Sequence, residues 1–431
     1  MLKLLQNLTA REKLMRRLGP LIGDFNPFLP EYRQDPHATF KRFRENQPVF
    51  FSRAFGFFLF TRYDDCLEVL RNPALSSDRR DTALFRGLRW LNRKEPEFSG
   101  FFERNLLMVD GEDHRRLRGL VGRAFTPRRV AALRPRLEGV ADELLDKVAR
   151  HGRMELVEDF AYPFPLVAIA ELLGVPREDH ERFRRWTAGL TQFLDPLQGN
   201  DGAAPMRQAT RDLFAYFREL LAARRAEPRD DLVSAMIQAE ADTGQVDEND
   251  LPALCTLLLA AGHETTSSLI GNAVVALQRY PEQRKRLIED PALMPTAVEE
   301  FLRFDSPVVL TDRAVTEDVE IGGQRFRRGK MVGVLLASAN RYADQFKEPD
   351  SLDVGRDPNP HLALGHGNHF CLGAQLARRR RDRPGRAAQT LPRFSGLCRR
   401  HRVATLDGVA RAPDSARSPL SLCNPTGKRT H

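Results

Sequence analysis

The chain has 431 residues, of which 42% are hydrophobic and 29% charged, so it can bury a sizeable core and is too apolar for a disordered chain. Its 29 Gly and 28 Pro are ordinary shares, and no internal repeat occurs, which excludes collagen-like and solenoid proteins. Five scattered cysteines are too few for a disulfide framework, so a reducing, cytoplasmic location is expected.

The formal net charge of +9 is concentrated at the end of the chain. Residues 378–431 contain 14 Lys and Arg against three Asp, so they carry +11 and leave −2 for residues 1–377. Because the body is close to neutral, the overall charge is no argument for nucleic acid as a partner.

Residues 1–25 form a basic amphipathic segment in which Leu alternates with Lys and Arg. This segment lacks an unbroken apolar stretch and a small-residue cleavage site, so neither a signal peptide nor a stable membrane anchor is expected.

Further along, residues 49–61 are rich in Phe around a central Gly and predict a β-hairpin. From residue 110 onward the periodicity is helical, with predicted helices at 114–125, 130–150, 164–173, 178–193, 210–225 and 232–239.

The most apolar segment, residues 251–280, is long enough to raise the question of a membrane span. His263 and Glu264 stand at its centre, where a charge in lipid costs on the order of 2–3 kcal/mol, so a buried core helix is favoured. Residues 319–339 predict strand, turn and strand, hence a small sheet late in the chain, and a Pro-rich meander follows at 346–360. The predicted fold is mainly α with small β-sheets (α+β), with a long central helix and a small β-rich region near the N-terminus.

The sharpest local motif is a glycine-rich loop that leads into a helix at Cys371. A thiolate in such a place is favoured by the helix dipole and by free backbone N–H groups, and it serves as a metal ligand or a nucleophile. Gly365, Gly367 and Gly373 remove side chains where the backbone comes close to a large planar ligand. Two alternatives are a buried structural cysteine and a zinc site formed by His361, His366, His369 and Cys371.

A second motif in the apolar helix consists of Ala261, Gly262, His263, Glu264 and Thr265. Gly262 costs up to about 1 kcal/mol of helix stability, and a Thr hydroxyl can bond to the carbonyl one turn back. A carboxylic acid beside an alcohol in apolar surroundings can relay protons to a bound ligand. The alternatives are weaker: a core helix whose Glu points outward, and a zinc-protease motif that fails because Ser267 replaces its second histidine.

Two further pairs share helix faces. Glu300 and Arg303 lie at i,i+3, a spacing that by itself is most often a surface ion pair. His114 and Arg118 lie at i,i+4 with further arginines between them. Cations on one helix face repel unless they share an anion, so a carboxylate or phosphate partner is indicated; a solvated basic face is the alternative.

Together these four motifs resemble the cytochrome P450 family, haem-thiolate monooxygenases, in its soluble bacterial form. The resemblance covers residues 26–378 and implies haem b as cofactor, with Cys371 as the axial thiolate of its iron. It further implies that Gly365 and Gly373 shape the ligand loop and that Ala261 and Gly262 lie at the cofactor. The remaining roles that it implies are haem-propionate contacts at His114, Arg118, Arg313 and His369, oxygen binding and proton delivery at Glu264 and Thr265, and a structural pair at Glu300 and Arg303 that Arg356 joins.

The implied activity is insertion of one oxygen atom from O2 into a small hydrophobic organic substrate, while the other atom leaves as water. Because the chain has no flavin or iron–sulfur motif, electrons would come from a ferredoxin or flavodoxin-type donor with its own reductase. Substrate contacts are implied within residues 76–107, 183–198, 258–261 and 308–310, which are apolar with few polar anchors.

The chain departs from the family pattern in three places, the first being Ser351 and Leu352, which replace an expected Arg-Phe in the meander. Leu364 stands where the family strongly favours Phe beside the thiolate, and the resemblance ends near Arg378. The tail, residues 379–431, is rich in Arg, Pro and Ser, which suggests a shifted reading frame, a replacement or a disordered segment. The alternative function is therefore a haem-binding protein with impaired or no turnover.

Overall fold

The computed structural model describes residues 34–83, 85–87, 96–124, 126–149, 154–194, 204–243 and 247–374, together with 19, 23–27, 29 and 32. The basic segment predicted for residues 1–25 lies almost entirely outside this range, and the tail at 379–431 lies wholly outside it. None of the helices in the described ranges combines the length and the apolar character that a membrane crossing requires.

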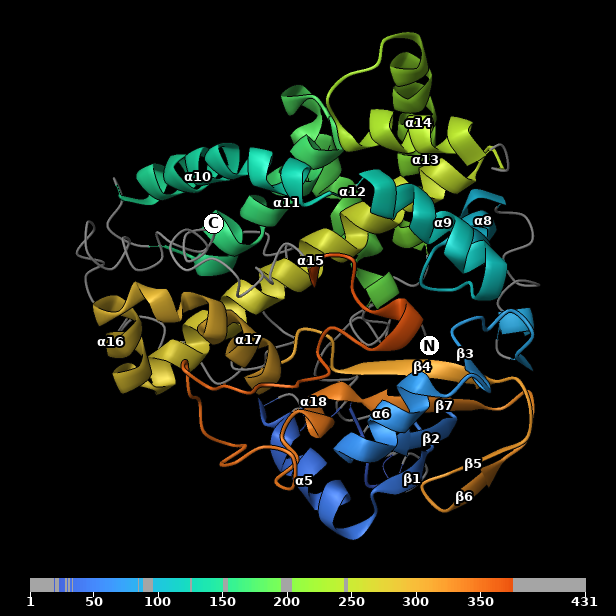
Figure 1. Cartoon of the computed structure of the whole chain (residues 1–431), viewed down its shortest axis with the longest axis vertical. Coiled ribbons are helices and arrows are strands. Elements are labelled where there is room, and N and C mark those ends of the chain that lie inside the picture. Colours follow the sequence, from blue (N-terminus) through green and yellow to red (C-terminus); the bar gives the residue numbers. More distant parts are fainter. Residues whose placement is uncertain are drawn as a thin grey trace, which may run out of the picture.

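The larger part of the molecule is helical and surrounds the long helix α15 (Figure 1). The predicted helices between residues 114 and 239 all overlap observed helices, but several of their ends differ: the helix predicted at 210–225 begins six residues earlier, at 204, and the one predicted at 232–239 ends four residues later, at 243. The helices of this part are α8 (Pro96–Arg104), which was not predicted, α9 (Gly111–Ala124), α10 (Pro127–Ala149), α11 (Pro163–Leu173), α12 (His180–Leu194), α13 (Ala204–Ala226), α14 (Leu232–Thr243) and α15 (Asp250–Arg279). A π-helical turn, Val157–Ala161, precedes α11, and a 3-10 turn, Arg177–Asp179, precedes α12.

Helix α15 is the buried core helix that its sequence predicts. It runs obliquely between the other helices and the sheet (Figure 1), and most of its first half is buried all round. A helix that is apolar on every side must be covered on every side, and here the rest of the protein covers it. The helix continues without a break through Gly262, so the local weakening expected there does not interrupt it.

The strands form one five-stranded sheet and one hairpin. The order in the large sheet is β1-β2-β7-β4-β3, from β1 (Val49–Ser52), β2 (Phe57–Phe60), β7 (Met331–Leu335), β4 (Leu310–Val315) and β3 (Leu75–Ser76). The predicted hairpin at residues 49–61 is confirmed by the antiparallel pair β1–β2. Strands β5 (Val319–Ile321) and β6 (Gln324–Phe326) form the small late sheet. The late strand β7, however, pairs in parallel with β2, so both ends of the described chain build the large sheet.

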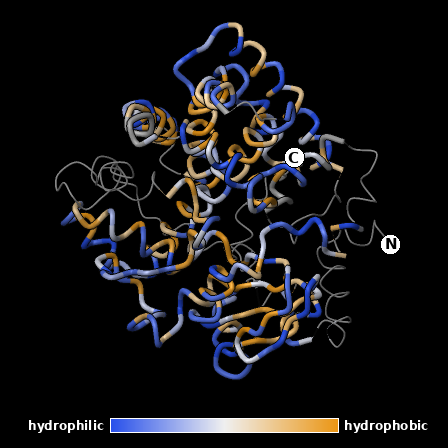
Figure 2. The backbone as a smooth tube through the Cα atoms, turned by 45° about the vertical axis from the view of Figure 1, so that its right-hand side comes forward, coloured by the Kyte–Doolittle hydropathy of each residue, from blue (hydrophilic) through white to orange (hydrophobic). Residues whose placement is uncertain are grey.

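Of the remaining short helices, some pack beside the sheet and others follow the end of α15 (Figure 1). They are α5 (Pro36–Asn46), α6 (Tyr63–Arg71), α16 (Pro281–Glu289), α17 (Met294–Phe304) and α18 (Leu336–Ala339), with 3-10 turns at Pro291–Leu293 and Gly367–His369. Hydrophobic stretches run through both the helical part and the sheet (Figure 2), and each part has its own buried cluster. The described chain ends between α15 and β4 (Figure 1), which brings the Cys371 loop to the middle of the molecule.

Candidate functional site

The loop that carries Cys371 is folded by its own backbone hydrogen bonds. The amide of Cys371 donates to the carbonyl of Leu364 (2.9 Å), and the amide of Phe370 donates to the carbonyl of Gly367 (3.0 Å). Gly365 and Gly367 have φ values of +70° and +69°, a left-handed conformation that glycine adopts without steric cost. Two of the three predicted glycines are therefore required by the turns that place the cysteine.

The Cys371 side chain is exposed, and backbone N–H groups point at its sulfur. A Cβ atom at Gly373 would lie 3.6 Å from Sγ, so glycine keeps one side of the sulfur open. Surrounding protein atoms still desolvate the sulfur and raise its pKa above the ordinary thiol value, although the amides of Gly373 and Ala374 and the charge of Arg118 act the other way. The prediction that the loop alone favours a thiolate is thus not met. A metal cation bound to the sulfur would supply the missing stabilisation, because a coordinating thiol loses its proton.

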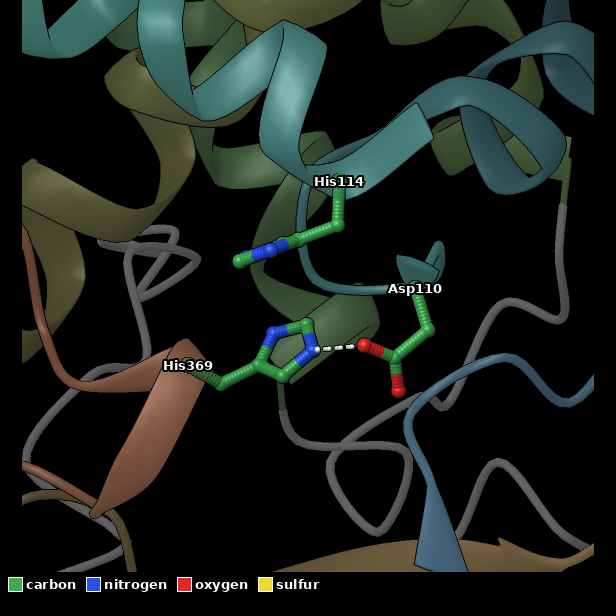
Figure 3. Close-up of side chains that lie close together, drawn as sticks. All are labelled: Asp110, His114 and His369. Carbon is green, nitrogen blue, oxygen red and sulfur yellow. Dashed lines mark hydrogen bonds and ion pairs between the residues drawn. The ribbon is translucent and has the colours of Figure 1, made fainter. Parts of the chain in front are cut away.

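Cationic side chains from distant segments converge next to this loop. His114 and Arg118 come from α9, His369 from the 3-10 turn before Cys371, and Arg313 from β4. The rings of His114 and His369 face each other with centroids 4.2 Å apart (Figure 3). Arg118 donates a hydrogen bond to the carbonyl of Phe370 (2.7 Å), beside the cysteine. The structure therefore brings these predicted residues together from three parts of the sequence.

The electrostatics of the cluster favour an anionic ligand. Burial, with the charges of His369 and Arg118, lowers the pKa of His114 to about 4, and burial, with the charge of Arg79, lowers that of Arg313 to about 10. His114 is 2% exposed, and its Nε2 atom has no hydrogen-bond partner among the described residues. A buried polar atom without a partner is costly, and a carboxylate placed here would satisfy it and offset the crowded positive charge.

One acidic residue in the cluster was missed by the sequence reasoning. Asp110 immediately precedes α9, and its carboxylate lies 3.4 Å from Nε2 of His369 (Figure 3). Burial tends to raise the pKa of Asp110, but hydrogen bonds from His369, Ser76 and Ser77 outweigh it and hold the pKa below the ordinary range. The signal that could have found it is an Asp just before a helix, four residues ahead of His114.

The alternative zinc site is not assembled. His361 lies 3.3 Å from a carboxylate oxygen of Glu299, and His366 contacts Arg71 on α6. Within the described ranges, three residues have ligand atoms close enough together to hold a metal ion: Asp110, His114 and His369. Cys371 is not one of them. The histidines around the cysteine therefore have separate partners.

The predicted proton-relay segment lies near the middle of α15. Thr265 donates its hydroxyl proton to the carbonyl of Ala261 (2.7 Å), as expected for a Thr that bonds one turn back. Ala261, Glu264 and Thr265 are half-buried. A Cβ atom at Gly262 would lie 3.4 Å from the side chain of Ile169 on α11, so this glycine also lets two helices pack closely.

Glu300 and Arg303 form a bidentate ion pair on α17 in which neither side chain is exposed. Arg356 of the meander donates to the same carboxylate at 3.0 Å, which confirms the expected third member. The alternative of a surface ion pair is therefore wrong. The cluster ties α17 to the meander that leads to the Cys371 loop.

These residues fit a haem group. An exposed sulfur with one open side suits axial ligation of iron, and two histidines with two arginines suit the pair of propionate carboxylates. The orphaned Nε2 atom of His114 is the observation that most directly calls for such a carboxylate.

Comparisons with known proteins agree with this geometry. Residues 88–380 match the family model described as Cytochrome P450. Cytochrome P450 107B1 of Saccharopolyspora erythraea is 40% identical over 364 residues, covering 83% of this chain and 87% of that protein. Vitamin D(3) 25-hydroxylase of Pseudonocardia autotrophica is 41% identical over 358 residues, covering 81% and 85%.

A solved structure extends the comparison to three dimensions. P450BioI, in complex with hexadec-9Z-enoic acid ligated acyl carrier protein, superposes with a TM-score of 0.77 at 33% identity, covering 86% of this chain and 92% of that one. Over that length the two chains share one fold. The chain therefore belongs to the cytochrome P450 family.

Proposed function

We propose that this cytochrome P450 inserts one oxygen atom from O2 into a hydrophobic organic substrate and receives electrons from a separate protein donor. Enzymes of this family bind haem b through a cysteine thiolate, and the haem supplies the oxygen-activating chemistry when bound. We assign Cys371 as that ligand because its sulfur is exposed and the charge of Arg118 acts on it. This accessible sulfur carries the proposal.

The cationic residues around Cys371 are assigned to the propionate carboxylates. His114 offers a buried nitrogen without a partner, and Arg313 is a buried guanidinium. Arg118 bonds to the carbonyl of Phe370 and is thereby held beside the cysteine. Charge-assisted hydrogen bonds of this kind anchor carboxylates and fix their orientation.

Glu264 and Thr265 are assigned to proton delivery. The Thr265 hydroxyl uses its hydrogen for the Ala261 carbonyl, which leaves the oxygen lone pairs available to accept a hydrogen bond from water. A half-buried carboxyl group at the neighbouring position can hold a proton and release it toward that water.

The proposed substrate is a small hydrophobic molecule. Leu258 and Ala261 on α15 and residues 308–310 are half-buried and almost wholly apolar. Phe183, in contrast, is fully buried against Trp186 and Phe217 in the helical core. Relatives whose names refer to vitamin D(3) and to hexadec-9Z-enoic acid support an apolar substrate.

A ferredoxin or flavodoxin-type protein with its reductase is the proposed electron source. The chain itself carries no flavin or iron–sulfur motif, so the electrons must enter from outside. Residues 26–378 are proposed as the haem domain, with residues 1–25 and 379–431 as additions to it.

The test is the absorption spectrum of the full chain, expressed with added haem and reduced with and without carbon monoxide. A strongly red-shifted Soret band is expected, and Cys371→Ser should abolish it. Cys66→Ala, which removes a buried thiol elsewhere, is the matched control and should keep the band. A band typical of histidine ligation, or no haem band, contradicts the proposal.

Turnover is tested separately. With a surrogate ferredoxin and reductase, vitamin D(3) or hexadec-9Z-enoic acid is expected to yield a product one oxygen atom heavier. A normal thiolate spectrum without any oxidised product from a broad panel of apolar compounds would instead support the haem-binding alternative.

A further inference from the structure

Asp110 joins three segments that are far apart in the sequence. One carboxylate oxygen, Oδ2, accepts hydrogen bonds from the hydroxyl of Ser76 (2.8 Å) and the amide of Ser77 (3.0 Å) at the end of β3. The other oxygen, Oδ1, faces Nε2 of His369 at 3.4 Å (Figure 3). The carboxylate therefore links the sheet, the start of α9 and the loop of the proposed haem ligand.

The two carboxylate oxygens of Asp110 have different partners, and this fixes the orientation of the carboxylate. Because Oδ2 is held by two donors from β3, Oδ1 cannot rotate away without breaking both bonds. His369 then has a fixed acceptor for one of its ring nitrogens, and its ring is held against that of His114, with centroids 4.2 Å apart. Partners of this type commonly orient the side chains that hold a cofactor.

The charge of Asp110 reaches most of the proposed propionate-binding set. It bonds directly to His369, and its negative charge acts on both His114 and Arg313 to raise their pKa values against burial. Two imidazole rings and one guanidinium thus lie within reach of one carboxylate before any ligand carboxylate arrives.

We infer that Asp110 is a positioning residue of the cofactor site, which orients His369, and through it His114, toward the haem propionates. This inference rests on the proposed function. Asp110 does not touch the reacting atoms; it acts through the histidine that it holds. Ser76 supports it by anchoring the opposite oxygen of the carboxylate.

The test measures the rate at which haem leaves the holoprotein for an excess of a haem-scavenging apoprotein. Asp110→Ala should accelerate this loss about tenfold, the factor expected for one hydrogen bond to a charged group. Ser76→Ala, which leaves the charge in place, should accelerate it in the same direction by a smaller factor. Asp113→Ala is the matched control, since this acid lies three residues after Asp110, in the first turn of α9, has a half-exposed side chain and should change the rate less than twofold.

A double-mutant cycle separates positioning from a merely structural role. In a His369→Ala chain, Asp110→Ala should accelerate haem loss less than twofold further, because its target is already gone. An undiminished effect in that chain, or no effect in the parent chain, overturns the inference. Denaturant unfolding of the haem-free variants serves as the second readout. The inference requires that Asp110→Ala accelerates haem loss by more than its effect on the free energy of unfolding accounts for. If the parent chain shows no thiolate-haem spectrum, the proposed function fails instead.

Discussion

Arg303 donates two hydrogen bonds of 2.8 Å to the carboxylate of Glu300, and neither side chain is exposed to solvent. The remaining guanidinium donors reach the carbonyls of Asn340, Pro349 and Ser351, so the charge is fully surrounded by acceptors. A buried ion pair persists only when such bonds offset its loss of hydration. This pair holds the meander to α17 and thereby supports the loop that carries the cysteine.

Removing one partner of this pair should destabilise the protein strongly. Glu300→Ala leaves Arg303 and Arg356 without their shared carboxylate and should lower the free energy of unfolding by about 3–5 kcal/mol. Denaturant unfolding and the haem content of the purified protein measure the effect. Lys285→Ala breaks an exposed pair with Glu289 and should change stability by less than about 0.5 kcal/mol. Equal effects of the two substitutions would contradict the structural role.

Arg118 should control how firmly the cofactor is retained. Arg118→Ala removes the hydrogen bond to the carbonyl of Phe370 and a cation beside Cys371, so haem should dissociate about tenfold faster. Arg123→Ala, on the same helix but exposed, should leave the rate unchanged. The rate of transfer to a haem-scavenging apoprotein is the measurement, and similar rates for both variants would argue against a cofactor contact at Arg118.

His263 should make the protein less stable in acid. Burial lowers its pKa to about 4 in the folded state, whereas the unfolded chain has an ordinary value near 6.5. Between these two values the unfolded state binds more protons, so stability falls as the pH drops from 6.5 toward 4, by up to about 3 kcal/mol. His263→Gln, which can still donate to the Tyr162 carbonyl, should flatten this part of the profile.

The measurement for His263 is denaturant unfolding of the haem-free protein at several pH values between 4.5 and 7.5. Parent and variant should differ most at the acid end. A parallel pair of profiles would mean that other groups cause the acid dependence.

Leu364→Phe should shield the sulfur of Cys371. The Leu364 carbonyl already accepts the Cys371 amide, and its half-buried side chain packs on the cluster around α17. A larger ring that covers roughly 25 Å² more apolar surface should slow haem loss about threefold. Alkylation of Cys371 in the haem-free protein should slow as well. Leu364→Met, which keeps the volume, is the control; an unchanged alkylation rate with Phe would show that the ring does not reach the sulfur.

The local features of this molecule could be predicted from its sequence. Helix α15 follows from an apolar run with no proline after its first turn, and the β1–β2 hairpin follows from a Phe-rich segment around a central glycine, which has φ of +77° in the turn. The Thr265 hydroxyl bond and the grouping of His114 with Arg118 also follow from helical spacing. Each depends on residues within a few positions of one another.

The pairing of β2 with β7, the contact of Asp110 with His369, and the burial of Glu300 with Arg303 could not be predicted in this way. The first two join residues more than 250 positions apart, and no periodicity encodes which distant segments meet. The Glu300–Arg303 pair looks the same in sequence whether its helix face is exposed to solvent or buried, and only the packing of the helix decides between the two.

The sequence by itself therefore determined the chemical groups of this protein and their local spacing, including a cysteine in a glycine-rich loop and cations on one helix face. Only the tertiary structure decided their environment: Asp110 among the cations, His114 with a buried orphan nitrogen, and Cys371 with a raised pKa. The physical reason is that desolvation and Coulomb interactions depend on distances in space, which are set once the whole chain has packed.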